Sequence, residues 1–147
     1  MSDLLDRMMT LGAESIAREV GKKGPMLSVF HVMYQDGHSG VIGAAWANSN
    51  EKVQILDAIK KSFIETNAIA YCFTTEAWTA LEIANDSRSP SERPDRKEIF
   101  MAFASDGTTK LTRVWDINRT SNGRVKSISE QNTNNSVFEG FIPNMLN

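Results

Sequence analysis

Glu76 has the clearest potential for chemistry in this sequence, because it is a carboxylate inside the hydrophobic run of residues 68–81. Trp78 follows two positions later, which places both side chains on one face if this run is a strand. A carboxylate in apolar surroundings must find a cation or give up its charge. Arg96 and Glu98 lie at the start of the next hydrophobic run, and pairing of the two runs as strands would bring them close to Glu76.

Two interpretations of these residues stay open. In the structural one, Glu76 and Arg96 form an ion pair that fixes the loop between the two strands. In the functional one, the loop covers a pocket where Glu76 or Glu98 acts as an acid or a base. Arg96 could instead hold an anion in that pocket, with Trp78 as a stacking surface. The same loop holds two further candidate binding residues, Arg88 and Arg93.

The common signatures of catalysis and of cofactor binding do not occur in this sequence. It contains no glycine-rich phosphate loop, no G-x-G-x-x-G motif and no G-x-S-x-G motif. Cys72 stands alone between two aromatic residues and is expected to be a buried, unreactive thiol. His31 is expected to be a strand residue satisfied by a neighbour, and His38 a solvated turn residue. With two histidines and one cysteine, we predict no metal site and no cofactor.

Length and composition are those of one soluble domain. The chain has 147 residues, of which 41% are hydrophobic and 23% charged, and this is enough to bury a core without disulfides. No apolar run approaches the roughly 20 residues of a membrane-spanning helix, and the acidic first residues are unlike a signal peptide. We therefore predict a cytoplasmic protein with no membrane partner. The net charge of −2 and the scattered basic residues, Arg119 among them, predict a solvated surface and no nucleic-acid partner.

The spacing of apolar residues predicts the secondary structure. Two amphipathic helices are expected, over residues 2–20 and about 49–66, and Asn48 and Glu51 have the spacing of a capping box at the start of the second. Apolar or alternating runs predict strands over residues 26–34, 41–47, 68–81, 97–105, 110–117 and 124–129. A long exposed loop, rich in serine, arginine and proline, is expected over residues 85–95.

These elements predict an α+β fold in one domain over residues 1–129. Strands joined by tight turns pair antiparallel, so we expect one antiparallel sheet of five to six strands, in the chain order helix, strand, strand, helix and four strands. The run 68–81 is the expected central strand, 124–129 an expected edge strand, and both helices are expected to cover one face. The order resembles that of roadblock and profilin-like folds, many of whose members are dimerising scaffolds, although no sequence motif carries this analogy.

Residues 130–147 are expected to be an Asn-rich linker followed by an apolar tail. The tail is too hydrophobic for a segment that stays in water. It is expected either to pack on the core of its own chain or to bind a second subunit or another protein. The residues through which it would bind a partner are Phe138, Phe141 and Ile142.

One stretch of the chain resembles a family of small bacterial and phage proteins that has no assigned activity. Residues 73–78 read Phe-Thr-Thr-Glu-Ala-Trp, and residues 89–98 read Ser-Pro-Ser-Glu-Arg-Pro-Asp-Arg-Lys-Glu. The family pattern is similar: a strand that ends in Glu-Ala-Trp, a loop with Pro-Ser and Pro-Asp-Arg, and a glutamate two residues after that arginine. The resemblance covers residues 69–107 and implies that the following residues form one unit: Glu76, Trp78, Pro94, Asp95, Arg96 and Glu98.

Three functions follow from these observations. The first is a non-enzymatic interaction module that acts as a homo-oligomer, because no catalytic motif is found. The second is a binder of a small molecule or nucleotide, in a phage- or defence-related role, with its pocket under the loop 85–95. The third is a hydrolase or lyase with Glu76 or Glu98 as general base, and it ranks last because no nucleophile or set of metal ligands accompanies these carboxylates.

Overall fold

The computed structural model describes residues 3–81, 88–131, 136–138 and 142–146. Within these residues it confirms the α+β class and the predicted order of two helices and an antiparallel sheet. The helices are α1 (Asp3–Ala17) and α2 (Ser49–Glu65), and a short 3-10 helix, η1, covers Pro90–Glu92. The strands are β1 (Ser28–Tyr34), β2 (Ser39–Ala44), β3 (Ala68–Leu81), β4 (Lys97–Ser105), β5 (Lys110–Arg119), β6 (Val125–Glu130) and β7 (Ser136–Phe138).

The sheet is built around β3, as the sequence predicts. Its strands lie in the order β2-β1-β3-β4-β5-β6, and β7 pairs with β3 outside this path. On one side of β3, β1 pairs with its first half and β7 with its last three residues. On the other side, β4 pairs with β3 from Tyr71 to Thr79. The edges of the six-strand path are therefore β2 and β6, and the prediction of an edge strand at the position of β6 is confirmed.

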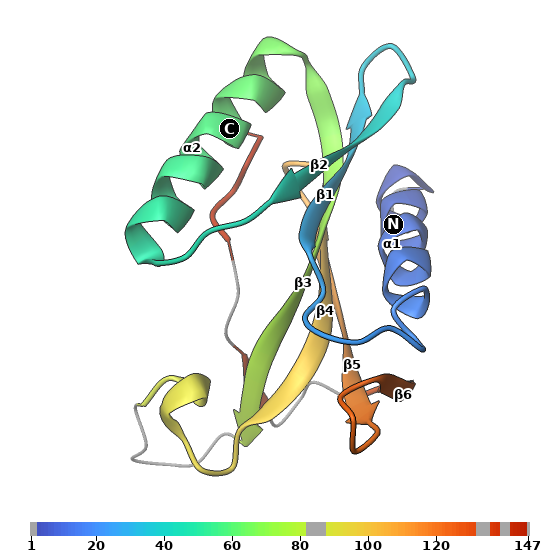
Figure 1. The fold of residues 1–147 in the computed structure, drawn as a ribbon. Coiled ribbons are helices and arrows are strands. Elements are labelled where there is room, and N and C mark those ends of the chain that lie inside the picture. The colour runs from blue at the N-terminus through green and yellow to red at the C-terminus, as the bar shows by residue number, and fades with distance from the viewer. Residues whose placement is uncertain (1–2, 82–87, 132–135, 139–141, 147) are drawn as a thin grey trace.

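The two helices cover opposite faces of the sheet, so the expectation that both cover one face is wrong (Figure 1). α1 packs on the face that carries Cys72 and Ala102, whereas α2 packs on the face that carries Tyr71 and Phe103. Successive residues of a strand point to opposite faces. Since both sets of β3 residues between positions 70 and 75 are buried, each face needs its own cover.

The end of the chain packs on its own core. Met145 is fully buried in the cluster beneath α2, and Ile142 and Leu146 are partly buried against the same cluster. The side chain of Phe138 and the whole of Phe141 lie outside the described residues, so the proposed contacts of these two residues with a partner stay predictions. In Figure 1 the C-terminus lies beside α2.

Small residues allow α1 to lie close to the sheet. Gly12 is buried, and a Cβ atom at this position would lie 2.4 Å from the Sγ atom of Cys72 and 3.3 Å from the Thr74 methyl group. Cys72 itself is fully buried and cannot move aside freely. The distance between α1 and β3 therefore depends on the missing side chain at position 12. Among the described helices, none is long and apolar enough to cross a membrane.

We expect Gly12→Ala to destabilise the protein. The overpacking against Cys72 should cost about 1–3 kcal/mol, which exceeds the gain of about 1 kcal/mol that alanine brings to a helix interior. In a Cys72→Ala background the close contact is removed, and the same substitution should become stabilising. Urea denaturation of the four proteins in this double-mutant cycle measures the change of sign. Equal effects of Gly12→Ala in both backgrounds would contradict the packing argument.

Candidate functional site

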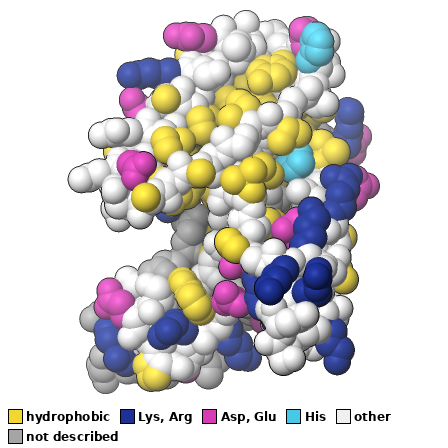
Figure 2. Space-filling model, in the orientation of Figure 1, with side chains coloured by type: hydrophobic (Ala, Val, Ile, Leu, Met, Phe, Trp, Pro, Cys, Tyr) yellow, Lys and Arg dark blue, Asp and Glu magenta, His cyan; other side chains and the backbone are white. Residues whose placement is uncertain are grey.

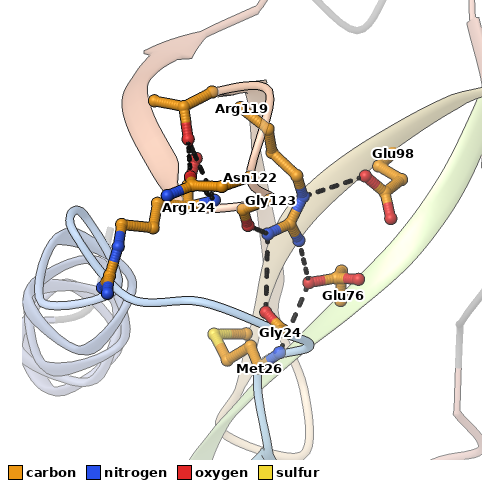
Figure 3. A network of polar contacts seen from close by, with 9 residues as sticks. Gly24, Met26, Glu76, Glu98, Arg119, Asn122, Gly123 and Arg124 are labelled. Atoms are coloured by element: carbon orange, nitrogen blue, oxygen red, sulfur yellow. Dashed lines mark hydrogen bonds and ion pairs between the residues drawn. The ribbon is translucent and has the colours of Figure 1, made fainter.

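Arg119, the last residue of β5, connects Glu76 of β3 and Glu98 of β4 (Figure 3). Its Nη2 donates to Oε1 of Glu76 at 3.0 Å, and its Nε donates to Oε2 of Glu98 at 3.1 Å. Its Nη1 donates to two backbone carbonyl oxygens, that of Gly123 at 2.9 Å and that of Gly24 at 3.4 Å. All three nitrogens of the guanidinium group thus bind oxygen atoms. We call these five residues, together with Met26, the Arg119 cluster.

The strand register explains why these side chains meet. Glu76 lies opposite Phe100 of β4, and Phe100 lies opposite Trp115 of β5, so all three point to the face covered by α1. Glu98 is two residues before Phe100, and Arg119 is four residues after Trp115. Because the side-chain period of a strand is two, both belong to that same face. Side chains from three neighbouring strands therefore converge beyond the end of α1.

The backbone of residues 21–27, in the linker between α1 and β1, also bonds to the cluster. The Met26 N–H donates to Oε1 of Glu76 at 3.3 Å, in addition to the bond from Arg119. Lys23 forms an isolated antiparallel bridge with Arg124 of the β5–β6 hairpin. Gly24 and Gly123 both have positive φ angles, 86° and 88°, which favour glycine where their carbonyls turn toward the arginine. The cluster thus ties the linker and the hairpin to the sheet.

The Glu76 carboxylate lies in an unfavourable environment for its charge. Its side chain is 18% exposed, against 19% for Arg119 and 38% for Glu98. Burial raises the pKa of Glu76 above its usual value, and the nearby Glu98 carboxylate adds to the rise. The Met26 N–H and the Arg119 guanidinium oppose the rise by stabilising the charged form, but burial is the largest effect.

The chemistry available to this cluster is limited. A shallow hollow of about 360 Å³ lies over it, lined by Lys23, Pro25 and members of the cluster. The hydrogen bonds to Arg119 and Glu76 are already made within the chain, so a substrate would have to displace them. Among the described residues, no three His, Cys, Asp or Glu side chains come together as a metal-binding group. The arrangement is typical of a structural ion-pair network.

The predicted Glu76–Arg96 ion pair is wrong, because Arg119 takes the place of Arg96. The β3–β4 register sets Thr79 opposite Lys97, so Arg96 lies beyond the level of Trp78 and too far along the sheet to reach Glu76. Instead, the Arg96 guanidinium lies over the indole ring of Trp78, 5.1 Å from its centre, and also donates to the Arg93 carbonyl at 3.4 Å. Trp78 is directly opposite Glu98, so these candidates share one face with Glu76.

The two remaining candidates, in the loop before β4, differ in burial. Arg88 is exposed, whereas Arg93 is only 1% exposed and forms an ion pair with Asp95 at 2.9 Å. Pro90 is also buried. The prediction of an exposed loop is therefore wrong for part of residues 88–95. The Arg93 guanidinium can be buried there because Asp95 supplies the carboxylate that a buried charge needs. The expected pocket under the loop falls partly on residues 82–87, outside the described residues.

The histidines and the cysteine have ordinary structural roles. Cys72 is a buried free thiol, as predicted, and burial raises its pKa to about 12, which disfavours the reactive thiolate. His38 is an exposed turn residue whose Nδ1 lies 2.8 Å from the Asp36 carboxylate. His31 is buried, but no described group bonds to its Nε2, so the prediction of a satisfied histidine is wrong for this atom. Burial and the charge of Arg18 lower the pKa of His31.

Arg119 is the residue that the sequence analysis missed. The sequence pattern predicts that its strand ends at residue 117, so Arg119 counts there among the scattered surface charges. The signal was present: Trp115, Ile117 and Arg119 continue the alternating pattern toward the Asn122-Gly123 turn. Extending the strand by two residues would have placed an arginine on the same face as Glu76.

We expect Arg119→Ala to lower the free energy of unfolding by about 2–3 kcal/mol, because it leaves two carboxylates and two backbone carbonyls without their donor. Arg113→Ala is the matched control. Arg113 lies on the same strand and pairs with Glu130, but both side chains are largely exposed, at 40% and 46%. Its loss should cost less than about 1 kcal/mol. Guanidinium chloride denaturation compares the two, and equal losses would contradict a special role for Arg119.

We expect Glu76→Gln to change how stability depends on pH. Since the folded pKa of Glu76 is raised, the folded state holds its proton more tightly than the unfolded chain. Wild-type stability relative to the Gln variant should be greatest below the ordinary glutamate pKa of about 4.3 and should fall as pH rises toward the raised value. Denaturation at several pH values between about 3.5 and 7 measures this difference. A relative gain by wild type on raising the pH would show that Arg119 lowers the pKa instead.

Comparison with known proteins gives no match for this chain. No protein-family model matches it, and no curated protein or solved structure does so. The resemblance of residues 69–107 to a bacterial and phage family therefore stays a prediction.

Proposed function

We propose that this chain is a non-enzymatic interaction module that forms a homo-oligomer through the free edge of β2. The observation that carries the proposal is the chemistry of this edge. β2 is the last strand of the sheet path, and among the described strands its only partner is β1. It contains six residues, Ser-Gly-Val-Ile-Gly-Ala, with neither a charge nor a proline. Such an edge presents free backbone N–H and C=O groups that readily pair with another strand.

The opposite edge of the sheet is protected. β6 carries Lys126 and Glu130, both exposed. Just before β6, the hairpin is bridged to the linker through Lys23 and Arg124. Charged side chains on an edge strand oppose strand addition. The contrast between the two edges supports specific association through β2 rather than non-specific association of the sheet.

Exposed apolar side chains surround the β2 edge. Val41 of β2 is 64% exposed, and Leu27, just before β1, is 60% exposed. Figure 2 shows hydrophobic side chains gathered over the region where β1 and β2 lie in Figure 1. Contiguous apolar surface of this kind marks a contact site more often than scattered apolar residues do.

Two further observations agree with the proposal. The carboxylates that could have served as acid or base are engaged in the Arg119 cluster, which favours a non-enzymatic role. The single cysteine is a buried free thiol, which suits the reducing cytoplasm, the compartment that we propose.

We expect the wild-type protein to be a dimer in native mass spectrometry and in light scattering, and Val41→Lys to be a monomer. A lysine at the edge leaves the fold intact, because residue 41 is exposed, but it opposes pairing. Val53→Lys is the matched control, since Val53 is 67% exposed but belongs to α2 and not to the edge strand. It should stay dimeric.

A monomeric wild type, or a Val41→Lys protein that stays dimeric, would contradict the proposal. An additional small mass that is retained in the native spectrum and lost on denaturation would favour the alternative function, binding of a small molecule or nucleotide.

A further inference from the structure

The hydrogen-bond pattern of the β1–β2 hairpin shows which backbone groups of β2 are free. The Tyr34 N–H donates to the His38 carbonyl at 2.9 Å, across the hairpin turn. Opposed residues of an antiparallel pair alternate between bonded and non-bonded pairs. With the observed register, in which Val32 lies opposite Gly40, the even-numbered residues of β2 bond to β1. The residues whose N–H and C=O groups point outward are then Ser39, Val41 and Gly43.

These three outward residues are spaced symmetrically about Val41. We infer that two copies of the chain pair β2 with β2 antiparallel, on a two-fold axis that sets Val41 opposite Val41 and Ser39 opposite Gly43. The inference rests on the proposed function and specifies its partner and register. Other antiparallel registers leave at least one outward residue unpaired, whereas this one uses all three in both copies. The two sheets then join into one.

Side chains fit this register. On the α1 face, the two exposed Val41 side chains become neighbours across the joined strands and cover each other. Gly43 lies opposite Ser39 of the partner, and Gly40 opposite Ile42, so each pair contains a small residue. No charged side chain of β2 is brought into the joint, because the strand has none.

Leu27 supplies a second contact between the two copies, beside the paired strands. Its Cδ2 atom lies 3.6 Å from the position of a Cβ atom on Gly43, so it covers that end of β2. At the other end, a groove of about 630 Å³ lies between α1 and the hairpin. Leu11, Met33 and Ser39 line part of it, and the polar residues Asp3, Asp6, Arg7 and Thr10 of α1 line the rest. Since the axis sets Gly43 opposite Ser39 of the partner, each Leu27 lies at the rim of the partner's groove. Antiparallel pairing of identical chains brings an exposed apolar side chain to the Leu11 and Met33 part of a groove at both ends.

Cysteine cross-linking tests the register. We expect Val41→Cys to form a disulfide between copies on mild oxidation, because residues of a bonded pair have Cα atoms about 5.5 Å apart, within disulfide range. Ser39→Cys alone should not link, since its two copies are about 13 Å apart along the strands. A mixture of Ser39→Cys and Gly43→Cys should link as a heterodimer. The native Cys72 is fully buried and supplies no background.

A second variant tests the groove contact. Leu27→Asp should weaken dimerisation at least tenfold, measured by dilution in native mass spectrometry. Ile64, which is 55% exposed on α2, gives the control, and Ile64→Asp should leave dimerisation unchanged. A dimer in which Ser39→Cys links and Val41→Cys does not would overturn this register and leave the interaction module standing. Dimerisation unaffected by Leu27→Asp would overturn the groove contact. A monomeric wild type would overturn both the register and the proposed function.

Discussion

The structure depends on one half-buried guanidinium group. Arg119 brings together two strands, a hairpin and a linker, and its bond to Gly24 joins residues 95 positions apart in the sequence. A guanidinium offers five N–H donors in a rigid plane, so it can reach more acceptors, spread over a wider area, than the three donors on the single nitrogen of a lysine. With its acceptors Glu76 and Glu98 held by strand pairing, the arginine determines where the linker crosses the sheet. The linker in turn sets the position of α1 relative to the strand that follows.

This constraint makes the two edges of the sheet different. The hairpin that the arginine holds also bonds to the linker, through the Gly21 N–H to the Val125 carbonyl at 2.7 Å and the Val125 N–H to the Lys22 carbonyl at 2.9 Å. The start of β6 is therefore occupied by the chain's own backbone. The same linker leaves Leu27 exposed beside the far edge, where β2 has no such cover within the described residues. One arrangement of the linker therefore has two effects. It bonds to the start of β6 at one edge of the sheet, and it leaves Leu27 exposed at the other edge.

Much of the fold can be predicted from the sequence, because its signals are local. The Asn48–Glu51 spacing predicts the start of α2, and there the Glu51 N–H does donate to Asn48 at 2.9 Å. The site was harder to predict, because its pairing depends on strand register. The residue opposite Glu76 is Phe100, four positions after Arg96, and this offset leaves Glu76 to a distant arginine. The faces covered by the helices could have been inferred, since a strand that is apolar on both sides needs a layer on each.

A bare, uncharged edge raises the question of why the protein would not assemble without limit. Glycine-rich strands specify register weakly, and an edge that accepts any strand is prone to aggregation. The proposed two-fold pairing would answer this, because each copy would use the uncharged edge of its six-strand path on the other. The joined sheet of the proposed dimer would end on both sides in β6, whose lysine and glutamate oppose further addition. In that dimer, apolar contacts at Val41 and Leu27 would fix the register that the glycines leave open. Closure of the proposed dimer at two copies therefore follows from the same difference between the two edges that the Arg119 cluster maintains.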